Sequence, residues 1–258
     1  MNLSGNTILI TGGTSGIGLA FATAFLSEGS KVIICGRRHD RLEQIRLKHQ
    51  QVIIKTCDIT DAKQRRELFD WVAAEHPDVN ILINNAGVQL LTDMTTEVDL
   101  GRVHSEIETN LVAPIHLASL FAQHLNSKSY AAIINISSGL AFVPIAFMPV
   151  YCATKAAIHS ITLSLRHQLK ETSVRVFEIA PPAVDTELGH DRREDKQQSH
   201  GGLTIDDFIT EAMQALRNDT FEAPIAQAKG SHAQREALFD VMNQRYQPSE
   251  KIEEQRLS

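Results

Sequence analysis

The sequence predicts an α/β fold in which a parallel sheet lies between two layers of helices. Its short apolar runs are continuous rather than alternating, which is typical of strands buried on both faces. Longer amphipathic segments separate these runs, as the crossover helices of a parallel sheet require. A glycine-rich turn follows the first run, where an open α/β sheet binds its ligand. These features predict one doubly wound, Rossmann-like domain over residues 1–258.

Each expected element is a distinct run of residues. The expected strands are 7–11, 31–35, 51–57, 79–86, 131–137 and 174–180. The expected helices are 17–28, 40–49, 62–76, about 97–125 and 150–171.

Two segments depart from this alternation. The charged segment 187–203 has no clear period, so it is either a solvated mobile loop or a lid over the substrate. The region of about 220–258 is a non-standard C-terminal extension, with a possible seventh strand at 220–228 and an extra helix near 233–246.

Composition narrows the functional class. A net charge of −6 disfavours nucleic-acid binding, and no apolar run approaches the roughly 18 residues of a membrane span. The cysteines Cys35, Cys57 and Cys152 have no redox or metal spacing, which indicates buried reduced thiols in a cytoplasmic protein. The eleven histidines are scattered, so we expect no metal site. A small molecule is the expected partner.

The turn after the first strand, "ILITGGTSGIGLA", has the composition of an anion site. Gly12, Gly16 and Gly18 carry no side chain where the backbone must turn sharply and approach a ligand. The helix that begins near Ile17 would present free amides and the positive end of its dipole. The turn therefore predicts binding of a dinucleotide pyrophosphate, with an ordinary strand–helix turn as the alternative.

Helix 150–171 carries Tyr151 and Lys155 one turn apart among apolar and small residues. A phenol has a pKa near 10, too high for efficient proton exchange at neutral pH. Lowering it by about 2–3 units requires roughly 3–4 kcal/mol of phenolate stabilisation, which a neighbouring ammonium can supply. The pair predicts a general acid/base. A structural tyrosine beside an outward-pointing lysine is the alternative.

Five motifs in register resemble the short-chain dehydrogenase/reductase family, in its single-domain branch of about 250 residues. They are T-G-x-x-x-G-x-G from Thr11 to Gly18, "NNAG" at 84–87, Asn110, Ser138, and Y-x-x-x-K at Tyr151 and Lys155. The resemblance covers roughly residues 5–190. Two further segments, "ISSGLAFVPIAFMPVYCATKAAIHS" and "VFEIAPPAVDTEL", are similar to a subgroup named after an oxidoreductase encoded beside teichoic-acid D-alanylation genes.

The resemblance implies a catalytic set of Asn110, Ser138, Tyr151 and Lys155. Ser138 would hydrogen-bond the reacting oxygen, whereas Ser137 should point away because strand side chains alternate. Asn110 falls within a predicted helix, where asparagine is a poor helix former. In the family this residue bends the helix and holds a water that links to the lysine.

The resemblance also implies the residues that bind the dinucleotide. They are Gly12, Thr14, Ser15, Gly16, Ile17, Gly18, Arg37, Arg38, Asp58, Ile59, Asn85, Ala86, Gly87, Tyr151, Lys155, Pro181, Val184 and Thr186. Asp58 would cap the adenine amino group, although an aspartate there is also a candidate N-cap of the next helix. Pro182 stands where the family usually has glycine, which stiffens the loop that holds the carboxamide.

The end of the second strand predicts the cofactor. Gly36 stands where an NAD-specific member would carry a carboxylate for the ribose 2′-hydroxyl. Arg37 and Arg38 follow, and a guanidinium matches a 2′-phosphate in geometry and charge. We therefore expect NADP(H) to be preferred over NAD(H).

The leading interpretation is an NADP(H)-dependent oxidoreductase that interconverts a carbonyl and a secondary alcohol. The alternatives are an epimerase or dehydratase that uses the cofactor transiently, and a cofactor-binding sensor or scaffold without turnover. We expect a homodimer through helices 150–169 and 97–125, with a tetramer as another possibility.

Overall fold

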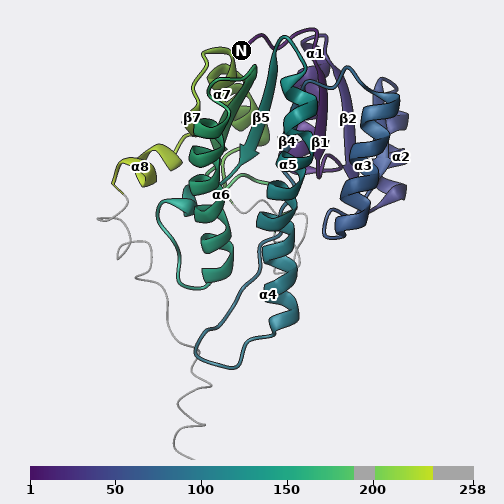
Figure 1. Cartoon of the computed structure of the whole chain (residues 1–258). Helices are drawn as coiled ribbons and strands as arrows, with labels where there is room; N and C mark the ends of the chain where they lie inside the picture. Colours follow the sequence, from purple (N-terminus) through teal and green to yellow (C-terminus); the bar gives the residue numbers. More distant parts are fainter. Residues whose placement is uncertain (189–200, 235–258) are drawn as a thin grey trace, which may run out of the picture.

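The computed structural model describes residues 1–188 and 201–234, and these form one parallel sheet with helices on both faces (Figure 1). The strands are β1 (Thr7–Thr11), β2 (Lys31–Gly36), β3 (Val52–Thr56), β4 (Ile81–Asn84), β5 (Ala131–Ile136), β6 (Val174–Ala180) and β7 (Glu222–Pro224). Their order is β3-β2-β1-β4-β5-β6-β7, and every neighbouring pair is parallel. The predicted fold class is confirmed.

The helices form two layers. Their bounds are α1 (Gly16–Ser27), α2 (His39–Lys48), α3 (Ala62–Glu75), α4 (Leu100–Ile107), the π-helix η1 (Glu108–Val112), α5 (Ala113–Asn126), the 3₁₀-helix η2 (Gly139–Ala141), α6 (Pro149–Gln168), α7 (Ile205–Arg217) and α8 (Ala228–Ala233). Helices α1, α2 and α7 cover one face of the sheet, and α3, α5 and α6 cover the other. Within the described ranges, no helix is long and apolar enough to cross a membrane.

The continuous apolar strands arise because successive side chains enter different cores. Ile8 and Ile10 of β1 pack in the cluster that contains Phe21 of α1. Leu9, between them, packs in the opposite cluster with Phe121 of α5. Since successive strand side chains point to opposite faces, a sheet covered on both sides needs apolar residues at every position.

The segment expected as one helix over 97–125 is interrupted in the middle. Asn110 lies in the π-helical turn, where the N–H of Ala113 donates to the carbonyl of Glu108. Residue 114 is a proline, which has no N–H to donate to the carbonyl of Asn110 as an α-helix would require. The bend expected at Asn110 therefore takes the form of a π-bulge.

The C-terminal part departs from the prediction in one clear way. Helix α7 is absent from the predicted helices, although Thr204 caps it by accepting from the N–H of Asp207 at 3.1 Å. The possible seventh strand at 220–228 is present as the shorter β7. Residues 189–200 of the possible lid, and almost all of the helix expected near 233–246, lie outside the described residues.

All three cysteines are buried and free. Burial raises the pKa of the Cys57 thiol to about 11 and also raises the pKa of Cys152. These thiols are therefore poor nucleophiles at neutral pH.

Phe208 of α7 tests how far the C-terminal helix stabilises the core. Its side chain is fully buried and meets the ring of Phe21 edge to face, with centroids 6.1 Å apart. We expect Phe208→Ala to lower the free energy of unfolding by about 3–5 kcal/mol through lost burial and a residual cavity. Urea unfolding measures this loss. Leu47→Ala, at a position 72% exposed, is the control, and equal effects of the two substitutions would contradict the packing.

Candidate functional site

The carboxyl ends of β1 and β4 are joined by a set of hydrogen bonds. Thr11 Oγ1 accepts from the N–H groups of Asn85 and Ala86, at 3.0 and 3.1 Å. The side-chain amide of Asn85 donates to the carbonyls of Thr11 and Gly12, at 2.9 and 3.2 Å. Gly12 has φ +67°, and a Cβ there would lie 2.8 Å from the Cα of Ala86. Only glycine fits this approach, so the two turns have a fixed separation.

The start of α1 has the features of an anion site. Its N-cap residue, Ser15, makes no side-chain capping bond, and the first turn contains no acidic residue. Ser15 therefore leaves the first N–H groups of the helix without a capping bond from its own side chain. This turn lies against the loop after β6, because a Cβ on Gly16 would lie 3.2 Å from Thr186. Free amides at the positive end of a helix fit a pyrophosphate. The predicted glycine turn and Thr186 are therefore brought together.

The end of β2 lies beside the same turn. A Cβ on Gly36 would lie 3.3 Å from the methyl group of Thr14. Arg37 and Arg38 are exposed, and Arg38 is the N-cap residue of α2. Neither guanidinium has an ion-pair partner within the ranges that the structure describes. Both residues thus directly follow the strand end that lies beside the glycine turn, and no described carboxylate pairs with either of them.

Asp58 and Ile59 follow β3. The Asp58 carboxylate accepts from the N–H and the hydroxyl of Thr60, at 3.0 and 2.8 Å. The N-cap of α3 is Asp61, which accepts from the N–H groups of Lys63 and Gln64. The alternative in which Asp58 caps this helix is therefore wrong.

Helix α6 is fixed to the sheet by a buried polar ladder. Asn84 of β4 donates to Asn135 of β5 at 2.9 Å, and Asn135 donates to the Thr162 hydroxyl at 2.9 Å. Thr162 in turn donates to the carbonyl of Ile158. All three polar side chains are buried, so the ladder opposes any rotation of α6 about its own axis.

Tyr151 and Lys155 lie in the first two turns of α6, and each is only 5% exposed. The Lys155 ammonium lies 5.7 Å from the centre of the Tyr151 ring. It donates to the carbonyl of Ile136, the last residue of β5, at 2.9 Å. The predicted pair is therefore buried together at the carboxyl end of the sheet.

The charge of Lys155 is affected by its surroundings. Burial lowers its pKa to about 8, and the carboxylates of Glu106 and Glu178 oppose this shift. At pH 7 the ammonium is therefore still mostly protonated. A buried cation so close to a phenol favours the phenolate form.

Asn110 and Lys155 meet at Gly87. A Cβ on Gly87 would lie 3.4 Å from Asn110 Oδ1 and 3.7 Å from Lys155 Nζ. Asn110 Oδ1 accepts from the N–H of Val88 at 2.8 Å, and its amide donates to Val88 O and to Thr154 Oγ1. The π-bulge, the loop after β4 and α6 thus converge on one point.

Ser138 follows β5 and is 7% exposed. It is the N-cap residue of η2, where its hydroxyl oxygen accepts from the N–H of Leu140 at 3.1 Å. Ser137 is also buried, and its hydroxyl lies 3.5 Å from the carbonyl of Ile179 in β6. The two serines therefore have different partners.

The loop after β6 is held at both ends. Pro181 O accepts from the N–H of Gly139 at 2.8 Å, beside the end of β5. Further along, Leu203 N donates to Ala183 O at 2.8 Å and Asp185 N donates to Leu203 O at 2.9 Å. These last two bonds flank Val184, so this part of the loop is tied to Leu203, just before α7.

Glu106 is a site residue that the motifs did not indicate. It is fully buried, and its carboxylate accepts from the N–H of Leu90 at 2.9 Å. Its charge raises the pKa of Lys155. Its position four residues before Asn110 is the one signal in the sequence that could have identified it.

An open apolar cleft of about 340 Å³ lies between α4 and the start of α6. Its lining residues are Met94, Val103, Ile107, Leu111, Pro149, Val150, Ala153 and Thr154. Tyr151 and Lys155 do not line it, although Thr154 links it to Asn110. The cleft therefore borders the predicted catalytic residues without containing them.

Comparison with known proteins agrees with this architecture. The family model described as short chain dehydrogenase matches residues 6–197. The uncharacterized oxidoreductase DltE of Bacillus subtilis (strain 168) is 42% identical over 248 residues, which cover 94% of this chain and 98% of the relative. This similarity confirms the predicted subgroup.

Solved structures show the same fold. A short chain dehydrogenase from Burkholderia cenocepacia J2315 in complex with NADP is 25% identical, with a TM-score of 0.81 over 94% of this chain and 99% of that one. A second, from Burkholderia phymatum in complex with NAD, is 22% identical, with a TM-score of 0.82 over 96% and 99%. Because the family model spans well over half of the chain, this protein is a member of the short-chain dehydrogenase family.

Proposed function

We propose that this chain is an NADP(H)-dependent oxidoreductase that interconverts a carbonyl group and a secondary alcohol by hydride transfer. The observation that carries the proposal is the buried pair of Tyr151 and Lys155, one helical turn apart, with the ammonium 5.7 Å from the phenol ring. A buried ammonium is costly unless it is paired or stabilises another group, and the neighbouring phenolate would be such a group.

In the reduction direction, Tyr151 gives its proton to the carbonyl oxygen as the alcohol forms. Lys155 stabilises the resulting phenolate, and the Ser138 hydroxyl donates a hydrogen bond to the same substrate oxygen. Asn110 holds Val88 and Thr154, and thereby keeps the loop after β4 against α6. When bound, the nicotinamide cofactor supplies or accepts the hydride.

The residues proposed to hold this cofactor form one continuous edge of the sheet. The N-terminal amides of α1 would bind the pyrophosphate, and Asn85, Ala86 and Gly87 would lie along the adenine-side ribose. Asp58 and Ile59 would contact the adenine. Lys155 would hold the nicotinamide ribose, and Pro181, Val184 and Thr186 would hold the carboxamide. The solved Burkholderia cenocepacia relative with NADP supports this class of ligand.

The preference for NADP(H) rests on the end of β2. Gly36 carries no carboxylate that would repel a 2′-phosphate, and it packs closely against Thr14. Arg37 and Arg38 are exposed beside it. A guanidinium offers two parallel N–H groups to a phosphate, which makes these residues the proposed 2′-phosphate site.

We also propose a cytoplasmic homodimer. Val112, Ile115 and Leu163 are apolar side chains that are between 36% and 42% exposed on η1, α5 and α6. Exposed apolar residues on neighbouring helices favour a second copy of the chain as their partner. Sedimentation equilibrium measures the oligomeric state directly.

Tyr151→Phe removes the proton and leaves the ring. We expect turnover to fall by about 10²–10⁴-fold, as loss of a general acid does, with little change in NADPH affinity. The assay is NADPH oxidation with a panel of carbonyl compounds. Tyr130→Phe, at a half-buried tyrosine beside β5, is the matched control. Retention of more than about a tenth of the wild-type rate in Tyr151→Phe would refute the assigned role.

The same assay on the wild type tests the alternative without turnover. A wild-type protein that binds NADPH but oxidises it with no compound would be a sensor.

Arg37→Ala should reduce NADPH affinity by about ten- to a hundredfold and leave NADH affinity almost unchanged, because one charge-assisted contact is worth about 1.5–3 kcal/mol. Fluorescence titration with both cofactors measures the two affinities. Arg46→Ala, which breaks an exposed pair with Glu43 on the same helix, is the control. Equal or tighter binding of NADH by the wild-type protein would overturn the proposed preference.

Lys155 should also make stability depend on pH. Burial lowers its pKa from 10.5 to about 8, so between these values the unfolded chain binds more protons at this group and stability rises with pH. We expect the wild type to gain about 2 kcal/mol of unfolding free energy relative to Lys155→Met between about pH 7 and 9.5. Urea titrations at the two pH values test this. Lys31→Met, at a lysine 72% exposed, should show a nearly constant difference from wild type, and a constant difference for Lys155→Met would contradict the buried charge.

A further inference from the structure

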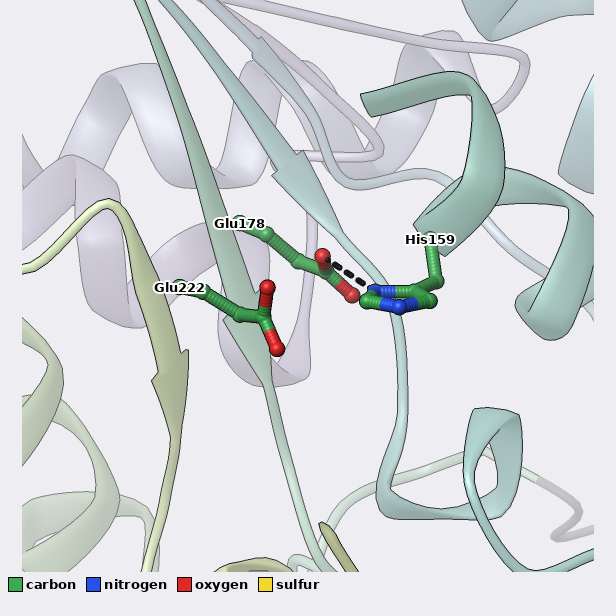
Figure 2. A group of neighbouring side chains, drawn as sticks. All are labelled: His159, Glu178 and Glu222. Atoms are coloured by element: carbon green, nitrogen blue, oxygen red, sulfur yellow. Dashed lines mark hydrogen bonds and ion pairs between the residues drawn. The ribbon is translucent and has the colours of Figure 1, made fainter. Parts of the chain in front are cut away.

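Two carboxylates and an imidazole converge at the far edge of the sheet. Glu178 of β6 and Glu222 of β7 are direct partners in the parallel pairing, and His159 of α6 lies over them (Figure 2). One ligand atom from each of the three side chains lies within 4.8 Å of the other two. Residues far apart in the sequence thus form one compact group of metal-ligating types.

The burial of Glu178 is the second observation. This side chain is completely buried, and its Oε2 lies 2.8 Å from His159 Nδ1. Its Oε1 has no hydrogen-bond partner among the described residues. A second carboxylate, from Glu222, faces it across the strand pair (Figure 2). Two neighbouring carboxylates with one buried oxygen unsatisfied are costly without a cation between them.

The surroundings resemble those of a metal ligand set. Glu222 Oε1 lies 2.7 Å from His232 Nε2 of α8, so this carboxylate already has an orienting partner. The ring of Phe142 meets His159 and His232 edge-on, at centroid distances of 5.1 and 4.8 Å. Metal-ligating carboxylates are typically held by such outer hydrogen bonds within an apolar wall.

We propose that His159, Glu178 and Glu222 bind a divalent cation, with Zn²⁺ as the best match and His232 positioning Glu222. An imidazole with two carboxylates suits Zn²⁺ better than Mg²⁺, which prefers oxygen ligands and retains its water. Bonds of about 2.0–2.2 Å place tetrahedral ligand atoms about 3.3 Å apart. The His159 Nδ1–Glu178 Oε2 distance of 2.8 Å is already near that separation. The carboxylate of Glu222, which is partly exposed on the short β7, would have to move closer to these two atoms.

The three proposed ligands come from three different elements, α6, β6 and β7. His159 lies one turn after Lys155 on α6, so the cation would tie the helix that carries Tyr151 and Lys155 to β6 and β7. The sequence predicted no metal site because no motif connects positions 159, 178 and 222. The proposal does not depend on the proposed oxidoreductase activity.

Calorimetric titration with ZnCl₂ tests the site on the full chain. We expect one tight Zn²⁺ per chain, weak binding of Mg²⁺, and a rise in Tm with Zn²⁺. Glu178→Gln and Glu222→Gln, which remove charge at constant size, should each lose more than about a hundredfold in affinity, and His232→Gln about ten- to a hundredfold. Glu43→Gln, at a partly exposed glutamate of α2, is the control for weak binding by surface groups.

Two results of the titration would contradict the proposed metal site. Zn²⁺ binding by both glutamate variants with wild-type affinity and stoichiometry would overturn the proposal, as would absence of tight binding in the wild type. Should Glu178→Gln fail to fold, Glu222→Gln decides, together with the visible spectrum of Co²⁺ added to the wild type. Intense bands from a four-coordinate Co²⁺ would support the site, and the weak bands of hexa-aqua Co²⁺ would count against it.

Discussion

The hydrogen bonds between Thr11 and residues 85–86 determine the geometry of the proposed active site. They lock the turn after β1 to the turn after β4, and the return bonds from the Asn85 side chain prevent sliding. Gly87 follows directly, and its missing side chain leaves room for Asn110 and Lys155 to come together. A shift of the first turn would therefore displace the loop against which the lysine packs.

The pKa of Lys155 reflects two opposing effects, its burial and the charges of nearby carboxylates. Burial makes the Lys155 charge costly, while Glu106 from one side and Glu178 from the other compensate part of that cost. Both carboxylates are completely buried, so solvent screens them weakly. The Lys155 ammonium itself donates to the carbonyl of Ile136 at the end of β5, at 2.9 Å.

The strands were predictable because a doubly covered sheet requires apolar residues at every position, and each expected run overlaps an observed strand. Helix α7 was missed because its start, Thr204, follows a charged segment that hides the capping signal. The bend at Asn110 was predicted, but its form depends on Pro114, one turn later. The clustering of His159, Glu178 and Glu222 could not be predicted, since it arises from the pairing of β6 with β7 and not from any local spacing.

The π-bulge rotates the side chains of α5 about the helix axis relative to those of α4. A turn closed by an i to i+5 bond takes up one residue more than an α-turn, which corresponds to about 100° of rotation. Val103 and Ile107, before the bulge, therefore face the cleft beside α6, while Leu117 and Phe121, after it, pack against the sheet. Substitutions in the cleft wall need not disturb the core, because the bulge makes the residues before it and the residues after it face in different directions.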